Sequence, residues 1–224
     1  MKKASGRPRR VLVVDVGGTH VKVLVTGAKE RRRIDSGHGL RPRRMVREVL
    51  RSCDGWEFDA VTIGYPGPVN DGRPAAEPPN LGAGWRRFDF AKAFGRPVRI
   101  VNDAAMQALG SYDGGRMLFL GLGTGLGSAM VVDGALVPLE LAHLPYRKGR
   151  SFEDYVGVAA IEKFGEKKWR RIVADVVAVL SAALLPDYVV IGGGNVRLLK
   201  TLPPNARRGD NANAFKGGFA LWKS

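Results

Sequence analysis

Apolar residues fall into two kinds of pattern along this chain: short β-branched runs and longer stretches with helical spacing. Runs at 11–16 and 20–25 flank a Gly-Gly turn and predict strand, turn and strand, and residues 30–37 can add a third strand. Residues 43–53 space their apolar side chains as a helix does. The first part of the chain therefore predicts a strand meander followed by a helix.

The next segment predicts a buried strand, a long loop and further short elements. "FDAVTIGYPG" (58–67) is apolar and ends in a Gly-Pro loop, and residues 68–85 are rich in proline and glycine. An irregular stretch of that length inside a compact domain is usually functional. A short helix at 88–95, a strand at 96–101 and a helix at 103–112 follow.

The second half of the chain repeats this order of strands and helices. Residues 116–141 predict a three-strand meander whose second turn is an Asp-Gly pair. Residues 152–185 have a helical pattern and predict two helices separated near Gly165. A strand with a triple-glycine end at 188–196 and a short helix at 213–222 complete the pattern.

Each half opens with an apolar strand, a glycine-threonine turn and a second apolar strand. "VVDVGGTHVKVLV" and "FLGLGTGLGSAMVV" share this shape, which indicates an internal repeat. We therefore expect an α/β protein of two related lobes that pack around a cleft. The expected lobes are 1–101 and 102–212, with 213–224 packing back on the first.

The charge balance adds a possible class of partner. The 224 residues carry 36 Lys and Arg against 21 Asp and Glu, a formal net charge of +15, with an arginine-rich segment at 29–51. Such a surface attracts polyanions, namely nucleic acid, acidic lipid or a phosphorylated substrate, although a general bias toward basic residues would look the same. The sequence has neither the spacing of a zinc finger nor aromatic residues interleaved with the basic ones, as nucleic-acid-binding proteins often do. We therefore do not expect nucleic acid as a partner.

Cellular location follows from cysteine usage and hydropathy. Cys53 is the single cysteine, so no internal disulfide can form, which fits a reducing compartment. The basic N-terminus is followed by an apolar run that is short and carries an aspartate, unlike a secretory signal or a membrane span. We expect a cytoplasmic protein without a membrane partner.

Three glycine clusters could bind phosphate. "DVGGTH" supplies Gly17, Gly18 and Thr19, "GLGTGLG" supplies Gly123, Thr124 and Gly125, and "IGGGN" supplies Gly192, Gly193 and Gly194. Turns of this kind expose backbone N–H groups, which favour anions. Each could instead be a simple turn, two of them hairpins. Their joint occurrence favours phosphate binding.

Charged side chains flank the first glycine turn. Asp15 lies two residues before the turn, and a carboxylate beside bound phosphate usually means Mg²⁺, because the two anions would otherwise repel. Lys22 could reach the phosphate as a point charge.

Further polar side chains could carry chemistry on a hydroxylated substrate. Asn102 and Asp103 come at the carboxyl end of a predicted strand, where open α/β folds bind ligands, and Asp103 could take a proton from a hydroxyl nucleophile. One helical turn would aim Glu140 and His143 the same way. Glu153 stands near a helix start. The alternatives are helix capping for Asp103 and Glu153 and a structural role for His143.

A transition-metal site is not expected. The nitrogen and sulfur candidates are Cys53, His20, His38 and His143, and they show no ligand spacing.

Taken in order, the motifs "DVGGTHVK", "GYPGPV", "PPNLGAGW", "VNDAAMQALG", "GLGTGLGSAMVVDG", "ELAHLPY" and "VVIGGGN" resemble those of ROK-family sugar kinases, from about residue 10 to the C-terminus. The resemblance implies the two-lobed actin-like ATPase / sugar kinase (ribonuclease H-like) fold with a central cleft. It implies that Asp103 is the general base for a sugar 6-hydroxyl and that Asp15 lies near Mg²⁺. Sugar-binding residues would be Asn102, Glu140, His143, Glu153, Gly67 and Asn80, and the three glycine clusters would bind the phosphoryl donor.

Two departures from the general family pattern refine this expectation. Many ROK kinases carry a cysteine-rich zinc motif, which one cysteine cannot build, so no structural zinc is expected. Ala142 stands where the Glu-x-Gly-His motif of the family has glycine. A compact, zinc-free chain with "YPGPV" and a helix containing "KKWRR" is similar to the polyphosphate glucokinase branch, whose members use inorganic polyphosphate, often alongside ATP.

The expected function is phosphorylation of glucose or a related hexose by polyphosphate and/or ATP, in a homodimer. The alternatives are an ATP-dependent ROK kinase for mannose or an amino sugar, and a non-catalytic protein that binds polyanions or nucleic acid. ROK repressors carry an N-terminal helix-turn-helix, for which the ten or so residues before the first predicted strand are too few.

Overall fold

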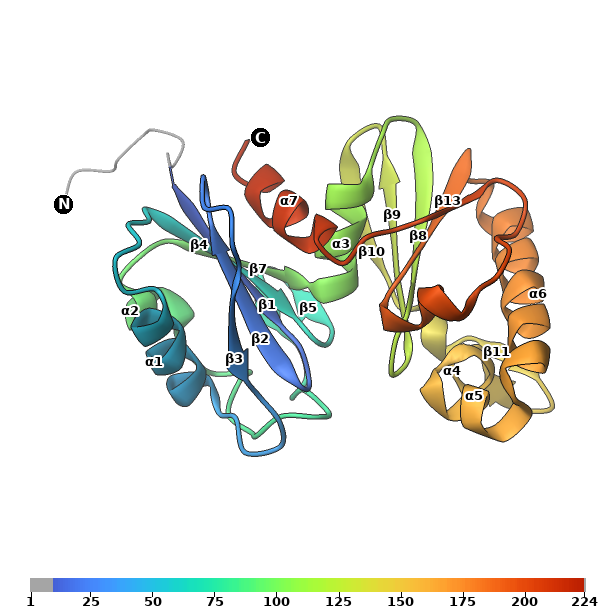
Figure 1. Cartoon of the computed structure of the whole chain (residues 1–224), viewed down its shortest axis with the longest axis horizontal. Coiled ribbons are helices and arrows are strands. Elements are labelled where there is room, and N and C mark those ends of the chain that lie inside the picture. The colour runs from blue at the N-terminus through green and yellow to red at the C-terminus, as the bar shows by residue number, and fades with distance from the viewer. Residues whose placement is uncertain (1–9, 224) are drawn as a thin grey trace. The chain divides into compact units, whose positions relative to one another are not determined.

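The computed structural model describes residues 10–223 (Figure 1). The basic residues 1–9, which contain most of the "RPRR" cluster, lie outside the described residues. Contacts divide the chain into two compact units. Unit 1 runs up to Asp103 and resumes at Gly217, and unit 2 is Ala104–Lys216. The chain thus passes between the units twice. The division predicted from the sequence lay at 101/102, with 213–224 returning to the first lobe.

Unit 1 is built on a five-stranded mixed sheet. Its strand order is β3-β2-β1-β4-β7, in which the first three strands are antiparallel neighbours and β1, β4 and β7 run parallel. The bounds are β1 Val11–Val16, β2 His20–Val25, β3 Arg32–Asp35, β4 Ala60–Tyr65 and β7 Val98–Asn102. These strands confirm the sequence predictions.

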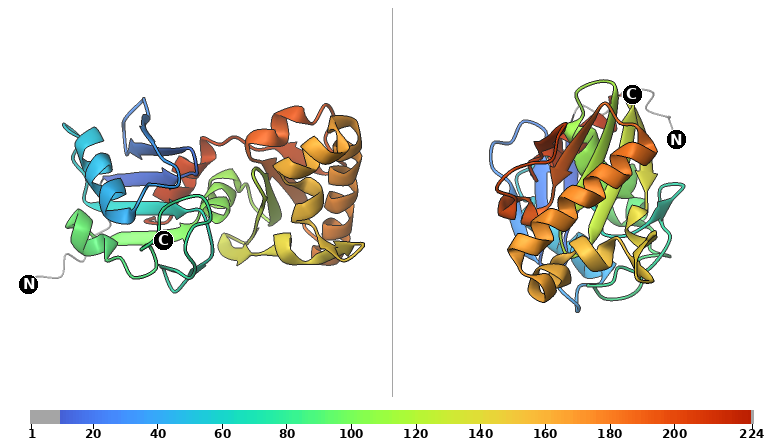
Figure 2. Two further views of the ribbon diagram at one scale, coloured as in Figure 1. Left: turned by 90° about the horizontal axis from the view of Figure 1, so that it is seen from below. Right: turned by 90° about the vertical axis from the view of Figure 1, so that its right-hand side faces the viewer.

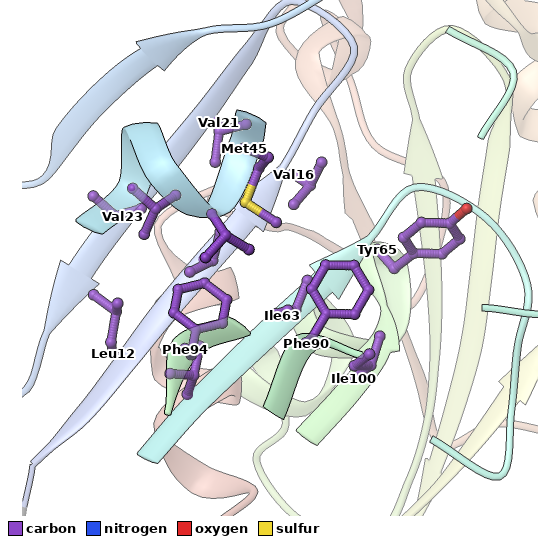
Figure 3. Close-up of a cluster of buried hydrophobic side chains, with 14 of the residues drawn as sticks. Leu12, Val16, Val21, Val23, Met45, Ile63, Tyr65, Phe90, Phe94 and Ile100 are labelled. Carbon is purple, nitrogen blue, oxygen red and sulfur yellow. The ribbon is translucent and has the colours of Figure 1, made fainter. Parts of the chain in front are cut away.

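Two helices cover one face of the first sheet (Figure 1). α1 spans Pro42–Ser52 and α2 spans Phe90–Phe94. Helix α2 ends at Gly95, as the sequence predicts, and this glycine adopts the left-handed conformation. Figure 3 shows Met45 of α1 and the two phenylalanines of α2 against strand residues such as Leu12 and Ile63, all of them buried. This packing fixes the strands whose ends carry the candidate site.

The opposite face of the first sheet receives the C-terminal segment. Helix α7 spans Asn213–Ala220, and at Gly218 a Cβ atom would lie 2.5 Å from Cγ1 of Val13, so only glycine allows this approach. The Thr62 hydroxyl donates to the Gly218 carbonyl at 2.8 Å and accepts from the Trp222 indole at 2.9 Å. These contacts explain why residues after Gly217 belong to unit 1.

The proline- and glycine-rich loop is not wholly irregular. A two-stranded hairpin, β5 Val69–Asn70 with β6 Arg73–Pro74, interrupts it. Asp71 and Gly72 form its turn, both with positive φ, of 49° and 70°. Asp and Gly are the residues that tolerate this conformation.

Unit 2 repeats the sheet of unit 1. Its order is β10-β9-β8-β13-β14, again three antiparallel neighbours followed by two parallel additions. The bounds are β8 Arg116–Leu122, β9 Leu126–Val132, β10 Ala135–Leu139, β13 Tyr188–Gly192 and β14 Ala206–Arg208. The internal repeat expected from two short motifs therefore extends to the topology of both sheets.

Helices cover both faces of the second sheet. Helix α3, Asp103–Ser111, packs its alanines on one face. The other face is covered by α6, Glu166–Leu184, with α4, Glu153–Val156, and α5, Val158–Phe164. Figure 2 shows α6, in orange, crossing this face.

The sequence predicted two helices in the α4–α6 region, and this was wrong. The separation at Gly165 is confirmed, but a second one occurs at Gly157. A Cβ at Gly157 would lie 2.8 Å from the Thr124 carbonyl oxygen, so glycine there permits a close contact with the loop before β9.

Short elements complete unit 2. They are the 3₁₀ turns η1, Leu141–His143, and η2, Gly194–Leu198, and the hairpin of β11, Pro145–Arg147, and β12, Arg150–Ser151. Over residues 10–223, no helix is both long enough and apolar enough to cross a membrane.

Candidate functional site

The carboxyl edge of the first sheet gathers the candidate residues of unit 1. The register sets Asp15 on β1 level with Gly64 on β4, and Tyr65 on β4 level with Asn102 on β7. The glycine turn, the start of the proline-rich loop and the Asn102-Asp103 pair all follow these strand ends. Parallel strands present ligand sites at this edge.

The first glycine turn is a hairpin held from outside. The Gly17 N–H donates to the His20 carbonyl at 3.0 Å, and the Ser36 hydroxyl donates to the Gly17 carbonyl at 2.7 Å. The Ser36 N–H also donates to the Thr19 carbonyl at 3.0 Å. Hydrogen bonds to the carbonyl groups of Gly17, Thr19 and His20 therefore hold the turn. Gly18 and Thr19 remain exposed. Sequence reasoning missed Ser36, because this residue is far from the turn in sequence and is brought next to it by the pairing of β2 with β3.

Asp15 is a buried carboxylate with a lysine at the upper limit of hydrogen-bond distance. The Lys22 ammonium lies 3.5 Å from its Oδ2. Burial raises the pKa of Asp15, against the lowering effects of Lys22 and the more distant Arg31. A further cation near Asp15 would stabilise its ionised form, so the residue suits one contact to a magnesium ion, which commonly takes one or two carboxylates and substrate phosphate. Within residues 10–223, no cluster of three or more His, Cys, Asp or Glu side chains could hold a metal by itself.

The structure links four predicted sugar and phosphate residues of unit 1 in two pairs. At Gly18 a Cβ would lie 3.3 Å from Cβ of Asn80, so the proline-rich loop rests on the glycine turn. The Asn102 amide donates to the Gly67 carbonyl at 3.1 Å. Asp103 follows directly as the half-buried first residue of α3. A carboxylate in the first turn of a helix is stabilised by the helix dipole.

The second and third glycine clusters pack on one another within unit 2. The Asn195 amide donates to the Gly123 carbonyl at 2.9 Å. At Gly193, where φ is +82°, a Cβ would lie 2.3 Å from the Leu122 carbonyl oxygen. Glycine is therefore required at 193 for contact between the two loops. Asn195 was not singled out from the sequence, although it follows the triple glycine directly.

The alternating glycines at 121–127 have different structural reasons. A Cβ at Gly125 would lie 1.9 Å from Oε2 of Glu153, and one at Gly127 would lie 2.7 Å from Cβ of Ala104. Among residues 10–223, apart from its own chain neighbours, no atom lies within 4 Å of a Cβ at Gly123. Approach of the backbone to a phosphoryl donor thus stays a prediction for Gly123, whereas Gly125 and Gly127 already face other parts of the chain.

Glu140, His143 and Glu153 form a charged cluster in unit 2. Partial burial raises the pKa of Glu140, the nearby Glu153 carboxylate raises it further, and His143 lowers it. Glu153 accepts a hydrogen bond from the Leu126 N–H at 3.2 Å, which ties this cluster to the glycine loop. The predicted pairing of Glu140 with His143 through one helical turn is realised by η1, which begins directly after Glu140.

Two further residues shape the η1 turn. The Ser128 hydroxyl donates to the Leu139 carbonyl at 2.9 Å and accepts from the Leu141 N–H at 3.1 Å. Ala142 is buried inside the turn, and its φ is not positive. A side chain of that size is therefore accommodated where the family motif has glycine.

This chain is similar in sequence to several known proteins. The sequence model of the ROK family matches residues 11–138. A polyphosphate glucokinase of Mycobacterium tuberculosis is 29% identical over an alignment of 202 positions, which covers 81% of this chain and 76% of that protein. A glucokinase of Pyrobaculum calidifontis is 28% identical over an alignment of 238 positions, which covers 82% of this chain and 79% of that protein.

Among solved structures, the inorganic polyphosphate/ATP-glucomannokinase from Arthrobacter sp. strain KM aligns with a TM-score of 0.80 at 23% identity. The alignment covers 96% of this chain and 98% of that one. The chain has the actin-like ATPase fold of such sugar kinases, as the sequence predicted.

Proposed function

We propose that this chain, which belongs to the ROK family, is a sugar kinase that transfers a phosphoryl group to the 6-hydroxyl of glucose. The observation that carries the proposal is the carboxyl edge of the first sheet. It combines a buried carboxylate, an exposed glycine turn and the Asn102-Asp103 pair at one set of strand ends. Phosphoryl transfer needs positioning and charge neutralisation more than covalent chemistry.

Asp103 is the proposed general base. Its carboxylate takes the proton of the sugar 6-hydroxyl while that oxygen forms a bond to the terminal phosphorus of the donor. The bond from that phosphorus to the bridging oxygen breaks, and the shortened donor leaves with the electron pair. A positioned base contributes about 10²–10⁴-fold to such a rate.

Asp15 is the proposed magnesium contact. Mg²⁺, when bound, neutralises charge on the phosphoryl oxygens. The backbone N–H groups of the exposed residues Gly18 and Thr19 would bind donor phosphate, and Lys22 would add a point charge within reach of Asp15. The Gly17 N–H is already used inside the hairpin, so its proposed role is to shape the turn.

Each unit offers its own side chains as ligands for sugar hydroxyls. In unit 2 the acceptors are Glu140 and Glu153, with His143 able to donate or accept. In unit 1 the Asn102 amide, fixed by the Gly67 carbonyl, and Asn80 would complete the set. Partial burial of Glu140 suits hydrogen bonding to a neutral polyol.

The second and third glycine clusters would hold the donor. The two loops touch where Asn195 bonds Gly123 and where Gly193 lies against Leu122. The donor proposed is inorganic polyphosphate, with ATP as an alternative or additional donor. A net charge of +15 favours a long polyanion, because many basic side chains can neutralise it at once. The name of the mycobacterial relative agrees with this choice.

The test is formation of glucose 6-phosphate from glucose, Mg²⁺ and either polyphosphate or ATP by the purified protein. Asp103→Asn is expected to lower kcat by about 10²-fold or more while glucose binding persists. Asp133→Asn is the matched control, since Asp133 lies in the β9–β10 turn with φ of 49°, which asparagine tolerates. An Asp103→Asn variant with full activity would contradict the assignment of the base.

Two other functions are distinguished by the same assay. An ATP-dependent kinase for mannose or an amino sugar would give product with those sugars and leave glucose unused. A non-catalytic binder would give no product with any hexose and would shift polyphosphate or nucleic acid in a salt-sensitive gel assay. The homodimer suggested by the family resemblance would be tested by sedimentation of the same preparation.

A further inference from the structure

The loop that carries Asn80 is anchored by residues to which no role has yet been given. It leaves β4 after Tyr65 and is closed around a carboxylate. Glu77 Oε2 accepts from the Gly84 N–H at 2.9 Å and from the Trp85 N–H at 3.0 Å. Its Oε1 accepts from the Arg86 N–H at 3.4 Å. The side chain of Glu77 therefore joins residue 77 to residues 84–86, and Asn80 lies in the segment between them.

The three N–H donors stabilise the ionised form of Glu77. They hold the pKa of this carboxyl below its usual range, although the side chain is largely exposed. A surface glutamate that served only solubility would have no need of three backbone donors. Charge-assisted hydrogen bonds of this kind are stronger than neutral ones.

The two ends of the loop are fixed in the core of unit 1. The buried Tyr65 donates its hydroxyl to the Ala76 carbonyl at 2.7 Å, and its ring lies 5.8 Å from that of the buried Trp85. A Cβ at Gly67 would lie 3.1 Å from the same tyrosine ring. Tyr65 thus supports both Gly67, which holds Asn102, and the residue directly before Glu77.

The far side of the loop is held by the segment before α1. The Gly82 N–H donates to the Leu40 carbonyl at 3.0 Å. At Gly82 a Cβ would lie 3.0 Å from the Arg41 side chain. Glu77 closes the segment 77–86, and Leu40, outside that segment, holds Gly82 within it. Asn80 lies between these two fixed points and contacts Gly18 at the glycine turn.

We infer that Glu77 is a positioning residue for the sugar: it acts through Asn80 and the loop 77–86, with Tyr65 supporting the same loop from the core. The inference rests on the proposed function. Glu77 itself touches neither substrate nor donor in this account, so its loss acts on sugar binding more than on the chemical step.

The test compares KM for glucose with kcat in three variants. Glu77→Gln keeps the size of the side chain but removes the charge and replaces one acceptor by a donor. It is expected to raise KM for glucose about tenfold while kcat stays within about threefold. Tyr65→Phe, which removes only the bond to Ala76, is expected to raise KM less. Asp89→Asn is the matched control, since Asp89 lies outside residues 77–86 and accepts from the Lys92 N–H at the start of α2.

Hydrogen exchange gives a second readout that does not depend on activity. The amides of Gly84, Trp85 and Arg86 should exchange faster in Glu77→Gln than in Asp89→Asn. An active wild type with unchanged KM and unchanged exchange in Glu77→Gln would overturn the inference and leave the proposed function standing. A wild type that phosphorylates no hexose would overturn both.

Discussion

Gly125 makes room for Glu153, and this contact allows a sharp test. In Gly125→Ala the new Cβ would lie 1.9 Å from Oε2 of Glu153, far inside van der Waals contact. The loop backbone is held by the hydrogen bond from the Gly123 N–H to the Gly125 carbonyl, at 3.1 Å. The carboxylate is the flexible partner, so it will move and lose its hydrogen bond from the Leu126 N–H.

The expected loss of stability is small. A hydrogen bond to a charged group contributes about 1.5–3 kcal/mol, and partial solvent exposure of Glu153 reduces this to about 1 kcal/mol. Alanine restricts the unfolded chain and returns about 0.4–1 kcal/mol, because φ at 125 is not positive. The net loss is therefore between about zero and 0.6 kcal/mol, or at most about 2.5 °C in Tm for a chain of this size.

The expected loss of activity is larger, because the displaced carboxylate is a proposed sugar ligand. We expect kcat/KM for glucose to fall about 10- to 100-fold, the cost of one charged hydrogen bond to substrate. Gly123→Ala is the matched control for Tm, since nothing lies within 4 Å of its Cβ. Thermal melts and coupled kinetics on both variants decide the matter. A Gly125→Ala enzyme with kcat/KM within twofold of wild type would refute this reasoning.

Three more outcomes follow from single residues. Gly193→Ala should lose more than about 2 kcal/mol of folding stability in denaturant melts, because φ is +82° and the Leu122 carbonyl oxygen is 2.3 Å from the new Cβ. Gly194→Ala is the control and should not lose this much, because space around its Cβ is open. Burial raises the pKa of Asp15, so ionising it lowers the stability of the folded protein as pH rises above the usual carboxyl range. With a chelator present, Asp15→Asn should have a higher Tm than wild type at pH 7, and the difference in Tm should vanish toward about pH 4. Burial also raises the pKa of the Cys53 thiol, so a maleimide should label it slowly in the native protein and rapidly in denaturant; equal rates would contradict this.

The elements were predictable from the sequence because they depend on local patterns. β-branched runs beside Gly-Gly and Asp-Gly turns specify the meanders, and Gly95 and Gly165 end or separate helices. The prediction failed at Gly157, where glycine serves a contact with the Thr124 carbonyl rather than a turn. That contact is made across the fold, and no local pattern encodes it.

The residues of the candidate site could be named from the sequence one by one, but the residues that hold the surrounding loops in place could not. Asp15, Asn102 and Glu140 stand out beside strand ends and turns. Ser36 and Glu77 act through backbone groups that only the folded chain brings near them. Serine and glutamate are common residue types, so neither position stands out in the sequence. Their partners are backbone N–H and C=O groups, which carry no sequence signal.

The most direct test of the account is identification of the product. Wild-type protein incubated with glucose, Mg²⁺ and polyphosphate, and in parallel with ATP, should yield glucose phosphorylated at the 6-position, as read by ³¹P NMR, and Asp103→Asn should yield almost none. Absence of any phosphorylated sugar with both donors, across glucose, mannose and amino sugars, would contradict the assignment of this chain as a sugar kinase.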